Sequence, residues 1–263
     1  MMIQYSFKLA AACCMALLAL VSGIKAQQRT DYDLYLLIGQ SNMAGRGEIS
    51  GAYQAAAPRH VVMFTKALQW VQAKHPLHFD KPKVAGVGPG LSFGEAMAQK
   101  KKRKTIALIP CAVGGSSIES WTPGGFDKPT GTHPYDDMLT RLQEAMKSGT
   151  LRGVIWLQGE ADTSPEKTKA YLAKLQALIT RIRTVAGNPQ LPFVAGELGA
   201  FRENYRQFNT ELDKLPQLVP FTAVATSEGL NHKGDNTHFD AASATEYGKR
   251  FAAKMKALQK HRS

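Results

Sequence analysis

One short segment, residues 33–45 with the sequence DLYLLIGQSNMAG, places the strongest constraint on how this chain folds. It starts with a run of apolar and aromatic residues whose length and composition are typical of a buried strand rather than a helix. The run stops at Gly39, and Ser41 follows two residues later. Because α/β sheets build their sites at the carboxyl ends of their strands, Ser41 is a candidate functional residue. A serine that simply caps the following helix fits the same pattern.

Similar strand-like runs recur along the chain, with helical patterns between several of them. We expect strands at residues 33–38, 61–64, 105–109, 153–157, 193–196 and 221–225. We expect helices at residues 91–102, 135–147, 165–186 and 241–258. The clearest helix has Ser164 as its N-cap and Gly187 as its stop. This alternation predicts a mostly parallel sheet covered on both faces, a three-layer α/β/α domain.

The amino terminus has the features of a secretory signal peptide. A weakly basic start precedes an apolar stretch over residues 9–24, and the small residue Ala26 follows. The stretch is shorter than the roughly 20 apolar residues that a membrane anchor needs. We therefore expect residues 1–26 to be removed after Ala26 and residues 27–263 to form one secreted or periplasmic domain. We expect no stable membrane insertion after that cleavage.

Cysteine and charge narrow the functional classes further. Cys111 is the one cysteine outside the predicted signal peptide, so we expect no internal disulfide. Because it lies in the apolar run IALIPCAV, we interpret it as a buried small hydrophobe rather than a reactive thiol. The net charge of +12 is spread along the chain without interleaved aromatics or a recognisable binding module, which argues against a nucleic-acid partner. The oligomeric state stays open.

A serine hydroxyl becomes a nucleophile only when a base takes its proton, and His238 is the histidine best placed to do so. It follows the last predicted strand and precedes the last predicted helix, which puts it at the same sheet edge as Ser41. Asp235 lies three residues earlier, a spacing in a loop that lets its carboxylate reach the imidazole. Asp240 competes for this role, but its position directly before the helix favours an N-cap.

Acyl transfer also needs hydrogen-bond donors for the developing oxyanion. Two predicted strand ends supply candidates. Gly114 and Gly115 offer backbone N–H groups after one strand, and Gln158 offers a side-chain amide after another. Taken alone, the glycine pair fits a plain turn, and Gln158 fits a hydrogen bond within a loop.

Four segments together resemble the conserved blocks of SGNH (GDSL-like) hydrolases, in the same order. More closely, they resemble the branch of sialate O-acetylesterases and acetylxylan esterases, carbohydrate esterase family 6. The segments are Gly39-Gln-Ser-Asn-Met, Gly114-Gly-Ser, Trp156-Leu-Gln-Gly-Glu-Ala-Asp and Asp235-Asn-Thr-His. The resemblance spans residues 33–252. Ser41 does not lie in the α/β-hydrolase elbow Gly-x-Ser-x-Gly, which argues against that fold.

The resemblance implies a flavodoxin-like α/β/α fold and removal of acetyl groups from sugar hydroxyls, with no metal or other cofactor. It implies that Ser41 is the nucleophile, His238 the base and Asp235 its partner. The implied oxyanion donors are the backbone amides of Ser41 and Gly115 and the side chain of Gln158. The wider superfamily has an asparagine in the third block, where this chain has Gln158-Gly-Glu160.

The neighbouring polar and aromatic residues are candidates for contacts with substrate. They are Gln40, Asn42, Ser116, Glu160 and Trp121. Glu160 fits equally a structural hydrogen bond, and Trp121 fits either stacking on a sugar ring or holding down its loop.

We expect a serine esterase that deacetylates carbohydrate, such as acetylated xylan. Alternatives are a sialate O-acetylesterase, a short-chain lipid or general esterase, or a non-catalytic glycan-binding protein on the same fold. The loops over residues 65–90 and 110–134 are expected to determine the substrate.

Overall fold

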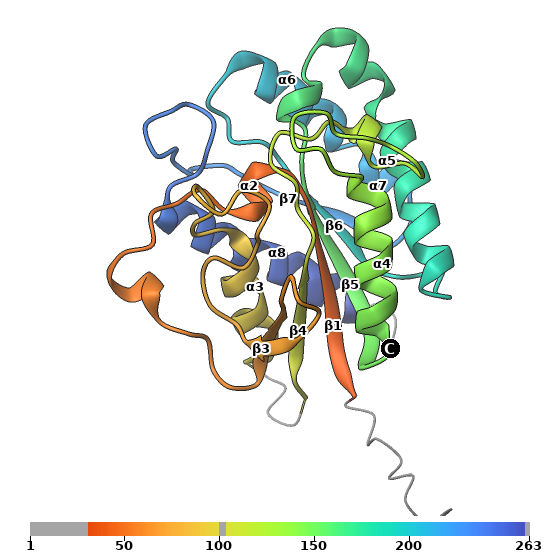
Figure 1. The fold of residues 1–263 in the computed structure, drawn as a ribbon. Coiled ribbons are helices and arrows are strands. Elements are labelled where there is room, and N and C mark those ends of the chain that lie inside the picture. The colour runs from red at the N-terminus through yellow and green to blue at the C-terminus, as the bar shows by residue number, and fades with distance from the viewer. Residues whose placement is uncertain (1–30, 100–103, 261–263) are drawn as a thin grey trace, which may run out of the picture. The chain divides into compact units, whose positions relative to one another are not determined.

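The computed structural model describes residues 31–99 and 104–260 (Figure 1). The predicted signal peptide, residues 1–26, lies outside this part of the chain.

A seven-stranded sheet forms the centre of the fold, in the order β3-β2-β4-β1-β5-β6-β7. Its strands are β1 (Tyr32–Gly39), β2 (Val61–Phe64), β3 (Trp70–Gln72), β4 (Ile106–Pro110), β5 (Gly149–Leu157), β6 (Phe193–Gly196) and β7 (Thr222–Ala225). All neighbouring strands are parallel except β3, which pairs antiparallel with β2 at the edge. The six predicted strands are confirmed. The prediction missed β3, because a three-residue edge strand that is largely exposed shows no apolar pattern.

Helices cover both faces of the sheet. They are α2 (Ser41–Ala44), α3 (Pro89–Ala98), α4 (Pro134–Met146), α5 (Pro165–Val185), α6 (Glu203–Leu212), α7 (Leu215–Leu218) and α8 (Ala241–Lys260). Short 3-10 turns occur at η2 (Gly51–Gln54), η3 (Ile118–Ser120) and η4 (Glu160–Asp162). Figure 1 shows α3 and α8 against one face and α4 and α5 against the other. The predicted three-layer α/β/α architecture is confirmed. The prediction missed α6 and α7.

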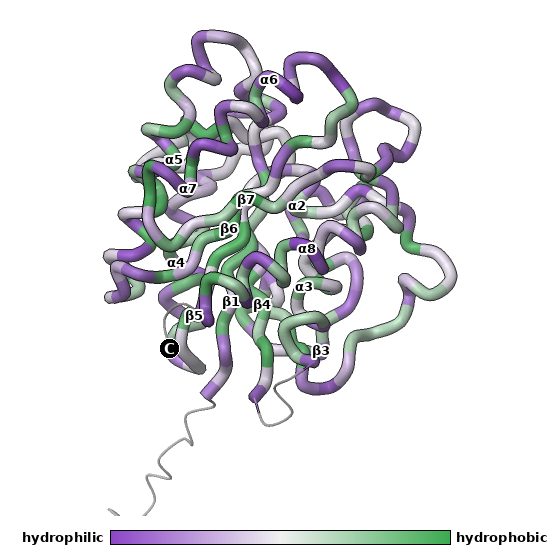
Figure 2. The backbone as a smooth tube through the Cα atoms, turned by 180° about the vertical axis from the view of Figure 1, so that it is seen from behind, coloured by the Kyte–Doolittle hydropathy of each residue, from purple (hydrophilic) through white to green (hydrophobic). Residues whose placement is uncertain are grey.

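The apolar run of β1 lies at the centre of this arrangement. Leu34, Leu36 and Ile38 belong to the core cluster beneath α4 and α5, while Tyr35 and Leu37 belong to the cluster beneath α3 and α8. Each of these side chains is fully buried, and burial of one such side chain stabilises a fold by about 1.5–3 kcal/mol. A strand buried on both faces needs no polar alternation, which explains the unbroken run. Figure 2 shows the same hydrophobic centre along the backbone.

The carboxyl end of β1 is where the chain turns toward Ser41. Gly39 has a φ of +133°, and a Cβ built on it lies 2.1 Å from the carbonyl oxygen of Leu157 on β5. The strand therefore ends against its neighbour in a conformation that only glycine adopts without strain. After one further residue, α2 begins with Ser41.

Candidate active site

The structure brings Ser41, His238 and Asp235 into one hydrogen-bonded chain, as the sequence predicted. Nε2 of His238 lies 3.0 Å from Oγ of Ser41, and Nδ1 of His238 lies 2.7 Å from Oδ2 of Asp235. Ser41 comes from the end of β1, whereas the other two residues come from the loop between β7 and α8. The arrangement is that of a nucleophile, a base and a carboxylate that orients the base.

Backbone hydrogen bonds hold the carboxylate of Asp235 in place. Its Oδ1 accepts from the backbone N–H of Thr237 at 3.0 Å and of His238 at 2.8 Å. Partial burial raises the pKa of Asp235, but these N–H groups and the imidazole of His238 outweigh it and lower the pKa to about 2. Asp235 is therefore ionised throughout the neutral range and available to a protonated imidazole.

Asp240 has the other role that its position predicted. Its Oδ1 accepts from the backbone N–H of Ser243 at 2.7 Å, at the start of α8. Asp240 thus caps this helix.

Asn42, the residue that follows Ser41, binds the loop that carries His238. Its Nδ2 donates to the backbone carbonyl of Thr237 at 2.9 Å and to Oε1 of Glu160 at 2.6 Å. Its Oδ1 accepts from the backbone N–H of Phe239 at 3.1 Å. With its side-chain donors and acceptor engaged and its side chain buried, Asn42 holds the site together and does not face a substrate.

Gln40 supports the turn that follows β5. It is buried, and its Oε1 accepts from Nε2 of Gln158 at 3.1 Å and from the backbone N–H of Gly159 at 3.4 Å. Of the two candidates for substrate contact on the Gly-Gln-Ser-Asn segment, Asn42 therefore differs from the prediction.

Two backbone N–H groups are free to bind an oxyanion. Within the described residues, the N–H groups of Ser41 and Gly115 donate no hydrogen bond. Gly115 is exposed and has a φ of +88°, and among those residues the only neighbour within 4 Å of its Cβ position is Nζ of Lys81, at 3.9 Å.

A buried ion pair braces this turn, and sequence reasoning missed it. Asp80 accepts from the backbone N–H of Gly114 at 2.8 Å and from Arg46 at 2.8 Å. The side chains of Asp80 and Arg46 are 1% and 5% exposed. Because their sequence positions follow no motif, only the fold reveals that they meet beside Gly115.

Gln158 lies beneath the turn with its amide already engaged. Its Nε2 lies 2.7 Å from Oδ2 of Asp162, 3.0 Å from the carbonyl of Ser116 and 3.1 Å from Oε1 of Gln40. The residue is fully buried, and its Oε1 accepts from the hydroxyl of Tyr171 at 2.8 Å. In this structure Gln158 ties the loop of Ser116 to β5 and offers no free N–H, in contrast to the predicted oxyanion donor.

Trp121 and Ser116 lie in the core rather than at a substrate surface. Both are fully buried, and Nε1 of Trp121 donates to Oγ of Ser116 at 3.0 Å. Trp121 also packs edge to face on Trp156 with ring centroids 5.2 Å apart. Of the two roles that the sequence left open for Trp121, the structure shows an aromatic that holds its loop.

Glu160 is a buried carboxylate behind the site. Its Oε1 accepts from Asn42, and its Oε2 is buried without a hydrogen-bond partner. Burial raises the pKa of Glu160 to about 7.

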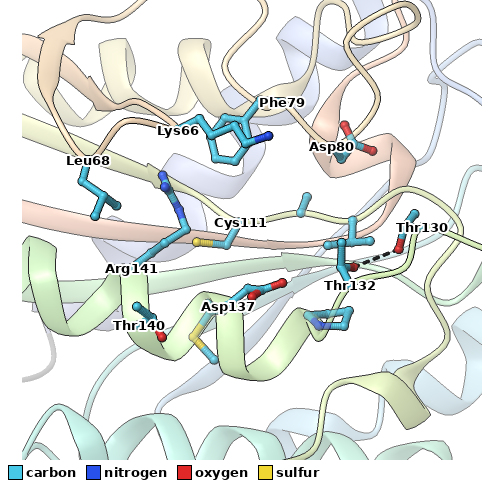
Figure 3. A pocket seen from close by; sticks show the side chains of 14 residues that line it. Lys66, Leu68, Phe79, Asp80, Cys111, Thr130, Thr132, Asp137, Thr140 and Arg141 are labelled. Atoms are coloured by element: carbon cyan, nitrogen blue, oxygen red, sulfur yellow. Dashed lines mark hydrogen bonds between the residues drawn. The ribbon is translucent and has the colours of Figure 1, made fainter. Parts of the chain in front are cut away.

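The two loops expected to determine the substrate meet around one cavity of about 420 Å³. Figure 3 shows Lys66 and Phe79 on one side, Thr130 and Thr132 on another, and Cys111 at the centre. The thiol of Cys111 is buried and its pKa is raised to about 11, which confirms that it is not a reactive thiol.

The described residues contain no group of three or more His, Cys, Asp or Glu side chains arranged to hold a metal ion. In the same part of the chain, no helix has the length and apolarity to cross a membrane.

Comparison with known proteins places this arrangement in a family. Residues 31–257 match the family model described as carbohydrate esterase, sialic acid-specific acetylesterase. The chain is 30% identical over 237 residues to a "Probable carbohydrate esterase At4g34215" of Arabidopsis thaliana, covering 82% of this chain and 86% of that protein.

Solved structures show the same fold. An X-ray structure of the Arabidopsis thaliana protein AT4G34215 superposes with a TM-score of 0.77 at 27% identity, over 86% of this chain and 98% of that one. A carbohydrate acetylesterase from Xanthomonas citri, XAC1771, superposes with a TM-score of 0.69 at 19% identity, over 87% and 57%. The match of the family model over most of the chain shows that this protein belongs to the carbohydrate esterase, sialic acid-specific acetylesterase family.

Proposed function

We propose that this protein is an exported serine esterase that removes O-acetyl groups from carbohydrate through an acetyl-enzyme on Ser41. The observation that supports this most strongly is the chain of hydrogen bonds from Ser41 through His238 to Asp235. Membership of the carbohydrate esterase family supports the ester and carbohydrate parts of the proposal.

The first half of the reaction forms the acetyl-enzyme. Oγ of Ser41 attacks the acetyl carbonyl carbon while Nε2 of His238 takes the serine proton. The negative charge on the carbonyl oxygen is stabilised by the backbone N–H groups of Ser41 and Gly115. Asp235 stabilises the imidazolium. The bond between the carbonyl carbon and the sugar oxygen then breaks, and His238 protonates the departing sugar hydroxyl.

The second half releases acetate. His238 takes a proton from a water molecule as that water attacks the acetyl carbon. When the tetrahedral intermediate collapses, the proton returns to Oγ of Ser41. Ser41 is then free for another cycle.

We propose acetylated xylan-type polysaccharide or oligosaccharide as the substrate. The second candidate is an O-acetylated sialic acid, which the description of the matching family favours. The cavity beside the site is the place proposed for the sugar units, because its wall residue Val113 donates its backbone N–H to Gly39, two residues before Ser41.

Acetate release by the purified protein tests the proposal, with wild type measured beside Ser41→Ala. The substrates are an aryl acetate, acetylated xylan and an O-acetylated sialic acid. We expect Ser41→Ala to lower kcat by roughly 10⁴-fold or more. Ser50→Ala, at an exposed serine, is the matched control and should retain wild-type rates.

Background rates for wild type on every substrate would point to the non-catalytic glycan-binding alternative. Turnover of the aryl acetate and of lipid esters but of no sugar ester would point to a general esterase. The sugar ester cleaved fastest identifies the substrate class.

A further inference from the structure

Three segments far apart in sequence meet at the side chain of Asn42. It follows Ser41 directly, and it bonds to the backbone on both sides of His238, at Thr237 and Phe239. Nδ2 of Asn42 also donates a hydrogen bond to Oε1 of Glu160, in the turn that follows β5. The distance between Ser41 and His238 therefore depends on where Asn42 is held.

Glu160 is the acceptor that holds Asn42 from behind. The bond of 2.6 Å from Nδ2 of Asn42 is short, as expected where the acceptor is a carboxylate. Its other oxygen, Oε2, is buried and has no partner, so it is not presented to a sugar arriving from solvent. An ionised carboxylate in such a place is costly for the fold, which makes a role other than stability the better explanation.

The groups around Glu160 do not neutralise it. The ionisable side chains that it faces are Asp162 on its own turn, Tyr171 on α5, Tyr205 on α6 and Tyr247 on α8. Burial and, to a smaller extent, the charge of Asp162 raise the pKa of Glu160 to about 7, although hydrogen bonds from the side chain of Asn42 and from the backbone N–H groups of Glu160 and Gly159 lower it. Glu160 therefore changes its charge in the pH range where an esterase of this type would work.

We propose that Glu160 is a positioning residue of the proposed esterase reaction: through Asn42 it holds the loop of His238 against Ser41. This inference rests on the proposed function. It assigns no contact between Glu160 and substrate, because the carboxylate acts through the amide of Asn42.

A double-mutant cycle tests the connection. The variants are Glu160→Ala, Asn42→Ala and the two combined, with kcat and KM measured on an aryl acetate. We expect each single variant to lower kcat by about 10-fold to 100-fold with KM changed less than about threefold, because a displaced base slows the chemical step. The double variant should be no slower than the worse single variant, since both changes break one connection.

Two further variants separate positioning from bulk stability. Glu160→Gln keeps an oxygen acceptor for Asn42 and should restore kcat to within about threefold of wild type at pH 6, where Glu160 is mostly protonated. Glu48→Gln, at an exposed glutamate, is the matched control and should leave kcat unchanged. Circular dichroism and thermal unfolding establish that each variant is folded.

The pH profile supplies a readout that a structural role alone would not move. Above pH 7 the ionised carboxylate of Glu160 binds the amide of Asn42 more strongly than a neutral amide oxygen does. The ratio of kcat for wild type to kcat for Glu160→Gln should therefore rise as pH passes through about 7.

Additive losses in the cycle, an effect on KM alone, or a ratio that does not change with pH would overturn the inference. The ring signals of His238 in NMR spectra give a test without turnover, and they should shift in Glu160→Ala. Unchanged ring signals would overturn the positioning role, whereas a wild-type protein without esterase activity would overturn the proposed function instead.

Discussion

Single buried polar side chains determine the geometry around Ser41. Gln40, Asn42 and Gln158 lie in the segments predicted to carry the chemistry, yet each is buried and hydrogen-bonded to the protein. A buried amide without a partner costs about 1–3 kcal/mol, so such residues hold loops together where they are fully bonded. The proposed chemistry therefore rests on Ser41, His238 and backbone N–H groups.

Gln158→Ala distinguishes a supporting role from an oxyanion donor. Because the change removes buried hydrogen bonds to Asp162, Ser116 and Tyr171, we expect thermal stability to fall by about 5 °C or more. The loss of kcat should follow from the displaced turn of Gly115. Thermal unfolding and aryl acetate hydrolysis measure the two effects.

The control for this variant is Gln69→Ala, at an exposed glutamine, which should change neither quantity. If Gln158→Ala kept its wild-type melting temperature while kcat fell by 10²-fold to 10³-fold, Gln158 would be a direct donor after all.

Among the secondary-structure elements, β1 determines the position of Ser41, the proposed nucleophile. The strand pairs with β4 on one side and β5 on the other, so its register is fixed from both edges. Gly39 then lies against the backbone of β5 at the point where the chain leaves the sheet. The loop after β7 brings His238 to the same edge, because all of the strands involved are parallel.

Gly39→Ala tests the close packing at the carboxyl end of β1. Its Cβ would lie 2.1 Å from the carbonyl oxygen of Leu157, at a φ of +133°. We expect the free energy of unfolding to fall by at least about 2 kcal/mol, with a large loss of esterase activity. Urea denaturation measures the stability change.

Gly51→Ala is the matched control for Gly39→Ala. Gly51 also has a positive φ, +52°, but nothing lies within 4 Å of its Cβ position. Gly51→Ala should lower the free energy of unfolding by about 1 kcal/mol and leave activity unchanged. Equal effects of the two variants would show that the loss of stability comes from the backbone conformation of Gly39 and not from its contact with β5.

For the whole molecule, two long loops and the amino end of α4 enclose the cavity beside the site. Residues from both loops line it, among them Lys66, Phe79, Cys111 and Thr132. Such a cavity combines apolar surface with a few polar groups, as ligand pockets commonly do. Surface loops tolerate sequence change more readily than the sheet beneath them, so the proposed sugar site can change without moving the proposed triad.

Lys66→Trp tests whether this cavity takes part of the substrate. We expect KM for an acetylated xylo-oligosaccharide to rise about tenfold, equivalent to 1.4 kcal/mol, with aryl acetate hydrolysis within about twofold of wild type. Lys83→Trp, at an exposed lysine outside the cavity lining, is the control. Equal KM values for wild type and Lys66→Trp on every sugar ester would place the substrate elsewhere.

The features that the sequence determined by itself depend on residues close together in the chain. They are the apolar run of residues 34–38, the helix from Pro165 and the Asp235–His238 spacing. From these, the α/β/α layers, six strands and the meeting of Ser41, Asp235 and His238 were predictable. The edge strand β3 and the helices α6 and α7 carried too weak a pattern.

Only the tertiary structure decided which polar residues near the nucleophile are exposed. Gln40 and Gln158 lie in the predicted blocks and Trp121 in a predicted loop, but their burial depends on partners contributed by remote segments. The pairing of Arg46 with Asp80, and the bridge from Glu160 through Asn42 to the His238 loop, join segments that no local pattern connects. Hydrogen-bond satisfaction is a property of the packed interior as a whole, and for that reason it appears only when the chain is folded.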